Sequence, residues 1–108
     1  HDRATDFIIS DGANISSLEV DEVCYRHPDI LEAAVVARPD PMWGESPCAF
    51  VTRHDGARTV QANVDNYCRQ HLAHFKAPRS VVFGPLPKTS TGKIQKFLLR
   101  NRAAALGD

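Results

Sequence analysis

Residues 87–94 of this 108-residue chain read PKTSTGKI, a short polar loop between an apolar run and a helical pattern. Hydroxyl side chains and a glycine fill the loop, and one lysine, Lys93, stands at its end. Glycine permits backbone angles that other residues resist, and a lysine ammonium is a compact charge that suits phosphate or carboxylate oxygens. The spacing excludes a P-loop, which needs Gly, four residues and then Gly-Lys-Ser/Thr, because Ile94 follows the lysine.

Outward from this loop, the spacing of apolar residues predicts a small α+β domain with two layers. We expect a short N-terminal hairpin plus a three-stranded sheet, packed with about three helices. In chain order, the expected elements are a hairpin at 6–16, a helix at about 17–27, strands at 30–38 and 46–53, a helix at about 59–73, a strand at 80–83 and a helix at about 95–104. A capping box of Ser16 and Glu19 opens the first helix, and the two central strands are expected to pair antiparallel.

Length and composition restrict the class of protein. A chain of 108 residues makes one small domain, and its hydrophobic content of 43% is ordinary for a globular protein. No apolar run approaches the ~20 residues of a membrane span, and no signal-peptide pattern opens the chain. The three cysteines (Cys24, Cys48 and Cys68) are widely spaced without a CxxC pair, and the five histidines lack ligand spacing. We therefore expect no metal site, no membrane span and a reducing compartment.

Charge is distributed unevenly although the formal net charge is zero. Residues 1–54 hold ten acids and four bases, whereas residues 55–108 hold three acids and nine bases. A basic C-terminal half favours a polyanionic partner, which could be nucleic acid, anionic lipid or a phosphorylated cofactor.

Four blocks of the sequence resemble, in order and spacing, the C-terminal domain of AMP-forming acyl-CoA synthetases, the acyl-adenylate-forming ligases. The first block runs from Asp2 to Glu19 and is similar to the family's hinge and the loop after it. Trp43-Gly44-Glu45 resembles the family's WGE turn, and residues 72–78 (LAHFKAP) resemble its L-x-x-x-K-x-P segment. The fourth block is the lysine loop extended to Lys96, which resembles PKTxTGKIQK. The resemblance covers nearly the whole chain.

The resemblance implies that residues 1–108 are the mobile C-terminal domain of an ATP-dependent acid–thiol ligase whose large N-terminal domain is absent. ATP and CoA would be substrates, with Mg²⁺ bound beside ATP outside this fragment. Partners would be the ligase's own N-terminal domain and a carboxylic acid that this fragment does not identify. We expect a cytoplasmic enzyme of fatty acid metabolism, and we expect the fragment alone to be inactive.

The resemblance also implies roles for residues of the adenylation half-reaction. Lys93 would supply positive charge where carboxylate and phosphate oxygens meet, an electrostatic role. Arg3 would meet the AMP ribose, so Arg3 and Lys93 are the nucleotide-binding residues. Thr5 stands at the hinge position, where the family usually has Lys or Asp.

Thioester formation would use a different face of the domain. Ser10, Asp11 and Gly12 would lie along the tunnel for the CoA thiol, although Asp11 replaces the first glycine of the family's usual pair. Phe75 would stack on the adenine of CoA. The implied CoA-binding residues are Ser10, Asp11, Gly12, Trp43, Phe75, Lys76 and Arg79.

Two alternatives stay open at this point. The first is the C-terminal subdomain of a peptide-synthetase adenylation domain, whose equivalent loop usually reads NGKVDR where this chain reads TGKIQK. The second is a stand-alone basic module that binds nucleic acid. Such modules interleave aromatic residues with bases, but the base-rich residues 75–102 contain only Phe75, Phe83 and Phe97, two of them in expected core elements. We therefore expect no nucleic acid partner.

Overall fold

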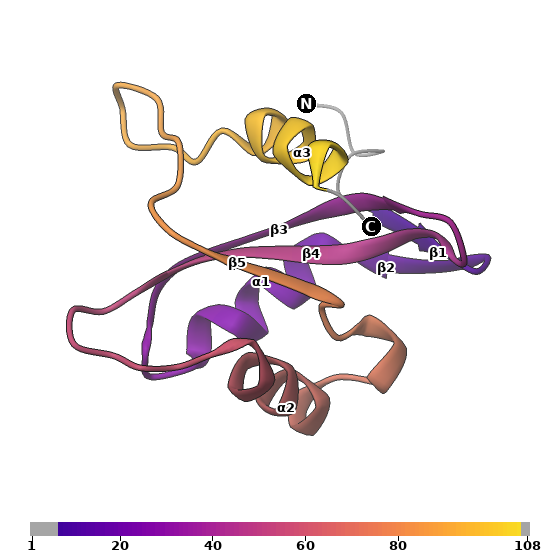
Figure 1. The fold of residues 1–108 in the computed structure, drawn as a ribbon, viewed down its shortest axis with the longest axis horizontal. Coiled ribbons are helices and arrows are strands. Elements are labelled where there is room, and N and C mark those ends of the chain that lie inside the picture. The colour runs from indigo at the N-terminus through magenta and orange to yellow at the C-terminus, as the bar shows by residue number, and fades with distance from the viewer. Residues whose placement is uncertain (1–6, 107–108) are drawn as a thin grey trace.

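The structure, a computed structural model, describes residues 7–106 as a mixed sheet with helices on both faces (Figure 1). Its elements are β1 (Phe7–Ser10), β2 (Ala13–Ser16), α1 (Ser17–Arg26), β3 (Ile30–Asp40), β4 (Gly44–Arg53), α2 (Gln61–His71), the 3₁₀ turn η2 (His74–Lys76), β5 (Ser80–Phe83) and α3 (Lys96–Ala105). The predicted α+β class is confirmed, and so is each predicted helix and strand to within a few residues.

Strand β4 lies at the centre of the five-stranded sheet that residues 7–106 form. The long strand β3 pairs with it antiparallel from Ile30↔Arg53 to Asp40↔Gly44, as predicted. Along its other side β4 meets β1 at Gly44 and then β5, which runs parallel to it from Cys48 to Val51. β3 continues to Asp40, past the expected stop at Pro39, because a proline is tolerated where an edge strand has no neighbour to receive its N–H.

The N-terminal hairpin is part of this sheet, whereas the sequence predicted it beside a separate three-stranded sheet. The sheet order is β2-β1-β4-β3, and the single register pair Ser10↔Gly44 joins the hairpin to the rest. Two further bonds reinforce that junction. The N–H of Asp11 donates to the carbonyl oxygen of Trp43 at 2.7 Å, and the N–H of Ile9 donates to Oε1 of Glu45 at 2.8 Å.

The helices lie on both faces of the sheet, so the predicted two-layer arrangement is wrong. α1 and α2 cover one face and α3 covers the other (Figure 1). Alternate residues of β4 serve the two cores, with Ala49 and Val51 facing α1 and α2 and with Cys48 and Phe50 facing α3. The continuous apolar runs of β3 and β4 are the sequence signature of this two-sided burial.

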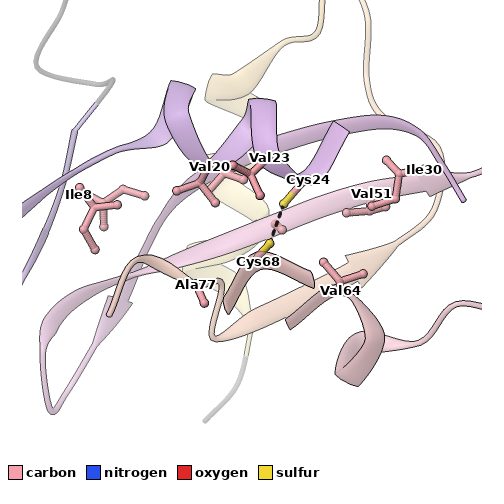
Figure 2. Close-up of a cluster of buried hydrophobic side chains, with 12 residues drawn as sticks. Ile8, Val20, Val23, Cys24, Ile30, Val51, Val64, Cys68 and Ala77 are labelled. Carbon is pink, nitrogen blue, oxygen red and sulfur yellow. Dashed lines mark hydrogen bonds between the residues drawn. The ribbon is translucent and has the colours of Figure 1, made fainter. Parts of the chain in front are cut away.

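A pair of thiols lies in the larger core, where α1 packs against α2. Cys24 and Cys68 are fully buried and their sulfur atoms are 3.6 Å apart, in hydrogen-bond contact (Figure 2). That hydrogen bond, followed by burial, raises the pKa of the Cys24 thiol. Cys48 lies in the smaller core, and burial raises its pKa to about 11. These cysteines therefore act as small apolar side chains in the described fold.

We expect all three thiols to resist Ellman's reagent at pH 8 in the folded domain. All three are buried, which keeps the reagent away from them. Cys24 and Cys48 also have a raised pKa and are protonated, hence unreactive, at pH values below it. The hydrogen bond with Cys24 lowers the pKa of Cys68, so burial alone protects that thiol. Absorbance at 412 nm should report three thiols in guanidinium chloride. Rapid reaction of any of them without denaturant would contradict the burial described here.

The second prediction concerns the core beneath α3. Leu99→Ala should lower the free energy of unfolding by about 2–5 kcal/mol, because Leu99 is fully buried and its truncation leaves a cavity. Phe97→Ala, two residues earlier on the same helix, is the control, since Phe97 is 53% exposed. Urea unfolding followed by circular dichroism measures both, and equal losses would show that α3 does not cover the sheet as described.

Candidate functional site

The lysine loop is a small hairpin closed by its own hydrogen bonds. Lys88 and Ile94 form an antiparallel bridge, and the N–H of Thr89 donates to the carbonyl oxygen of Lys93 at 2.8 Å. At the tip, the N–H of Gly92 donates to the carbonyl oxygen of Thr89 at 2.9 Å, and Gly92 has a φ of 87° that favours glycine. These hydrogen bonds restrict the conformation of the loop and fix the backbone position of Lys93.

The three lysines of this segment have different surroundings. Lys88 pairs with Glu32 at 2.5 Å, and Lys96 pairs with Asp21 at 2.7 Å. Lys93 is exposed, and no ion pair joins its ammonium to another residue between 7 and 106. Of the three lysines, Lys93 is therefore the one whose charge is not neutralised by an acid within residues 7–106.

The hairpin between β1 and β2 turns at Asp11 and Gly12, at the other end of the long axis from the lysine loop (Figure 1). Both residues have positive φ, 50° for Asp11 and 80° for Gly12, as a two-residue type I′ turn requires. A Cβ built on Gly12 meets nothing within 4 Å. Glycine is favoured at this position by the positive φ of the backbone. Close packing against other residues of 7–106 does not require it.

Trp43 is held beside this turn from two sides. Oδ1 of Asp40 accepts from the N–H of Met42 at 2.9 Å and from that of Trp43 at 3.1 Å. Desolvation opposes ionisation of Asp40, but these hydrogen bonds, with help from Ser46 and Arg79, lower its pKa. The guanidinium of Arg79 lies 4.7 Å from the centroid of the Trp43 ring, a cation–π contact.

A pocket of about 230 Å³ opens where these parts meet. Residues from the hairpin, the turn before β4 and the segment after α2 line it, namely Ser10, Asp11, Ala13, Trp43, Phe75 and Arg79. Five of the seven residues predicted to bind CoA therefore lie together, although up to 69 positions separate Ser10 from Arg79 in sequence. An exposed ring such as Phe75 and a half-buried ring such as Trp43 can stack on a heterocyclic base, and the guanidinium beside them can meet phosphate oxygens.

The remaining predicted residues lie elsewhere. Gly12 forms the tip of the turn, between two lining residues. Lys76 does not line the pocket; its ammonium pairs with Glu19 at 3.0 Å and lies 5.8 Å from the ring centroid of Phe75. Arg3 and Thr5, predicted for the ribose and the hinge, lie outside the residues that the structure describes.

Sequence reasoning missed several residues of this region. Ala13 lines the pocket because a two-residue turn places it opposite Ser10, a register that the Asp-Gly pair signals. Asp40 lies beyond the strand expected at 30–38, and its carboxylate holds the turn that carries Trp43. A second, polar pocket of about 210 Å³ adjoins the first and shares Phe75 and Arg79 with it, while Gln61, Arg69 and His74 complete its polar lining along with Asp65.

Residues 7–106 show neither a cluster of metal ligands nor a membrane-spanning helix. No group of three histidine, cysteine, aspartate or glutamate side chains comes together there as metal ligands. None of the helices in that range is both long and apolar enough to cross a membrane.

Comparison with known proteins identifies relatives over nearly the entire chain. Residues 19–93 match the family described as the AMP-binding enzyme C-terminal domain. A peroxisomal acetate/butyrate–CoA ligase of Arabidopsis thaliana is 55% identical over 112 residues, covering 98% of this chain and 20% of the relative. A 2-methylpropanoate–CoA ligase of Humulus lupulus is 54% identical, with the same coverage of both chains. This chain thus spans about a fifth of the length of these relatives.

Solved structures agree with the sequence matches. A fatty acyl CoA synthetase of Mycobacterium tuberculosis superposes with a TM-score of 0.86 at 36% identity, covering 93% of this chain and 20% of that one. An amide bond synthetase of Marinactinospora thermotolerans superposes with a TM-score of 0.88 at 38% identity, covering 96% of this chain and 21% of that one.

Unequal surroundings of the three lysines in the loop segment lead to a chemical prediction. With limiting acetic anhydride, Lys93 should be acetylated faster than Lys88 and Lys96, by up to about fivefold, because a partly exposed ion pair is worth ~0.2–1 kcal/mol. Mass spectrometry of the peptides measures the three rates. Glu32→Ala should raise the rate at Lys88 alone, and equal rates in the unaltered chain would contradict the assignment of partners.

Proposed function

Because the chain belongs to the family of AMP-binding enzyme C-terminal domains, we propose that it is the mobile C-terminal domain of an ATP-dependent, AMP-forming acyl-CoA ligase. Its partner in this proposal is the ligase's own N-terminal domain, since the chain covers about 20% of each relative. Two ends of the domain take part in two successive half-reactions.

In the first half-reaction, a carboxylate oxygen attacks the α-phosphorus of ATP, acyl-AMP forms and pyrophosphate leaves. Lys93 stabilises the negative charge that gathers on the crowded oxygens, as an electrostatic group that neither attacks nor takes up a proton. Its exposure and its braced loop support this role, because a cation already paired within the domain would have to break that pair first. Arg3 contacts the nucleotide ribose, and Mg²⁺ accompanies ATP on the N-terminal domain.

In the second half-reaction, the CoA thiol attacks the acyl carbon of acyl-AMP, the thioester forms and AMP leaves. The pocket beside the hairpin receives CoA, with Trp43 and Phe75 as aromatic surfaces and Arg79 near the phosphates. Gly12 lies along the path of the thiol, and Lys76 adds positive charge next to Phe75. Thr5, at the hinge, allows the domain to turn between the two half-reactions.

A single observation carries this proposal. The lysine loop and the hairpin between β1 and β2 lie toward opposite ends of the long axis of the domain (Figure 1), and Ser10, Asp11 and Ala13 of that hairpin line the aromatic pocket. One active site on the N-terminal domain cannot contact both ends at once, so the domain has to present them in turn. A rotating domain of this kind fits a reaction with two chemically distinct steps.

The names of the relatives bear on the acceptor and the compartment. Both plant relatives are named as CoA ligases, which favours a thiol acceptor over the carrier protein of a peptide synthetase. The amide bond synthetase shares the fold, so the fold alone does not select the acceptor. A cytoplasmic location stays a prediction, and the Arabidopsis relative is named as peroxisomal.

A pair of substitutions in the intact ligase separates the two half-reactions. Lys93→Ala should slow acyl-AMP formation by about 10²–10³, the typical effect of removing one preorganised electrostatic group. Consumption of supplied acyl-AMP with CoA should change little. Gly12→Leu should do the reverse, since a side chain would obstruct the thiol while the lysine loop is untouched. Pyrophosphate release and thioester formation are measured separately for each variant.

Gly56→Leu is the matched control for backbone strain. Gly56 has a φ of 83° with nothing within 4 Å of a built Cβ, as at Gly12, but it lies on the turn after β4 and outside the pocket. It should leave both half-reactions within about twofold, on the scale of ordinary surface substitutions. If Lys93→Ala and Gly12→Leu each reduce both half-reactions equally, the assignment of one end to each step is wrong.

The domain by itself should fold but release no pyrophosphate from ATP and a carboxylic acid. It carries one charged loop and half of a CoA site, and the acyl and ATP pockets belong to the proposed N-terminal domain. Pyrophosphate release by the purified domain, measured with a coupled enzyme assay, would contradict this division of labour.

A further inference from the structure

We propose that Asp21, on α1, is a positioning residue for the adenylation step, which it serves by fixing the start of α3 and thereby the place of Lys93. The proposal rests on the function proposed above for the lysine loop. Asp21 acts on the loop through its ion pair with Lys96.

The carboxylate of Asp21 joins three elements at the edge of the sheet. Oδ1 accepts from the N–H of Val35 in β3 at 2.5 Å, and Oδ2 accepts from the ammonium of Lys96 at 2.7 Å. β3 is an edge strand, so the N–H of Val35 points away from the sheet. α1 and α3 lie on opposite faces (Figure 1), and Asp21 therefore links the two helical layers around the outside of β3.

The ion pair with Asp21 stabilises the start of α3, which lacks a side-chain cap. Lys96 is the first residue of α3, and Gln95 at the cap position makes no side-chain capping bond. A lysine in the first turn is unfavourable, because the N-terminus of a helix carries partial positive charge. Asp21 supplies the missing negative charge, and the two side chains are only 21% and 23% exposed. Further along, Leu99 and Ala103 hold α3 by apolar packing, which is non-directional.

Only Ile94 and Gln95 separate Lys93 from Lys96, and both are held in place by hydrogen bonds to the other side of the loop. The N–H of Gln95 donates to the carbonyl oxygen of Pro87 at 2.9 Å, and the bridge between Lys88 and Ile94 closes the loop. Lys88 is itself tied to β3 through Glu32. Both ends of the loop are thus fastened to the same strand. A misplacement of ~1 Å can cost about 100-fold in rate. Loosening one end of the loop should therefore displace the ammonium of Lys93 and slow acyl-AMP formation.

The experiment uses the full-length ligase that contains this domain, with acetate as the probe acid and pyrophosphate release as the measure of adenylation. Asp21→Ala and Lys96→Met each break the ion pair from one side. Both should slow acyl-AMP formation by about 10- to 100-fold, with thioester formation from supplied acetyl-AMP and CoA within about twofold. The double variant should be no slower than the slower single variant, since each single variant already breaks the ion pair between Asp21 and Lys96.

Two further variants separate positioning from stability. Asp21→Asn keeps an oxygen for the N–H of Val35 but presents an amide NH2 to Lys96, and a donor cannot accept from the ammonium. It should therefore slow adenylation about as much as Lys96→Met while losing less stability than Asp21→Ala. Glu22→Ala is the matched control on α1. Within residues 7–106, Glu22 forms an ion pair with Arg26 of the same helix at 3.6 Å, and both side chains are exposed. This variant should leave both half-reactions unchanged.

Several outcomes would overturn the inference. If Asp21→Ala and Lys96→Met reduce both half-reactions to the same extent, together with a fall in melting temperature, the pair has only a structural role. Additive losses in the double variant would mean that the two residues act independently. If Asp21→Ala does not fold, Lys96→Met alone tests the proposal. A slower acyl-AMP formation with unchanged thioester formation supports positioning, and an equal loss of both overturns it. A folded, unaltered ligase that forms no acyl-AMP from any of a panel of carboxylic acids would instead overturn the proposed function.

Discussion

Strand β4 is covered on both faces, and most of the architecture depends on how that burial is achieved. Its alternate residues face two separate cores, so helices must lie on both sides of the sheet. Along one of its edges it pairs with β1 near Gly44 and with β5 further on. The hairpin turn is attached at the start of β4 and the lysine loop follows β5, whose last pair is with Val51. Since β4 is ten residues long and a strand rises ~3.3 Å per residue, the strand holds the two candidate sites at a distance of tens of ångströms.

Folding also redistributes the charge that the sequence segregates. The basic C-terminal half suggests a polyanionic partner, but three of its lysines pair with acids of the N-terminal half: Lys76 with Glu19, Lys88 with Glu32 and Lys96 with Asp21. These pairs fasten η2, the lysine loop and α3 to α1 and β3. Part of the positive charge that the sequence suggests for this half is therefore neutralised by ion pairs within the domain. Lys93 in its loop and Arg79 at the pocket keep their charge directed outward or onto an aromatic ring.

Local signals in the sequence were sufficient for the elements and for the turn types. Ser16 accepts from the N–H of Glu19 as a capping box requires, although the carboxylate of Glu19 pairs with Lys76. The Asp-Gly pair gives a two-residue turn with positive φ at both positions. The number of layers was predicted wrongly, because an apolar run reports that a strand is buried but does not say which helix covers which face. β3 likewise continued through Pro39, since a proline's effect on a strand depends on whether that strand lies at an edge.

The sequence by itself determined the family, the order of the elements and the identity of most candidate site residues, because these depend on short motifs with fixed spacing. Only the tertiary structure decided which of those residues meet. Ser10, Trp43, Phe75 and Arg79 come from separate segments and share a pocket because three connections converge at one end of β4. Lys76, next to Phe75 in sequence, pairs with Glu19 and does not line the pocket. The link from Asp21 to Lys96 spans 75 positions, and no local rule predicts it, since a pairing between two surface charges is selected by the packing of the layers that carry them.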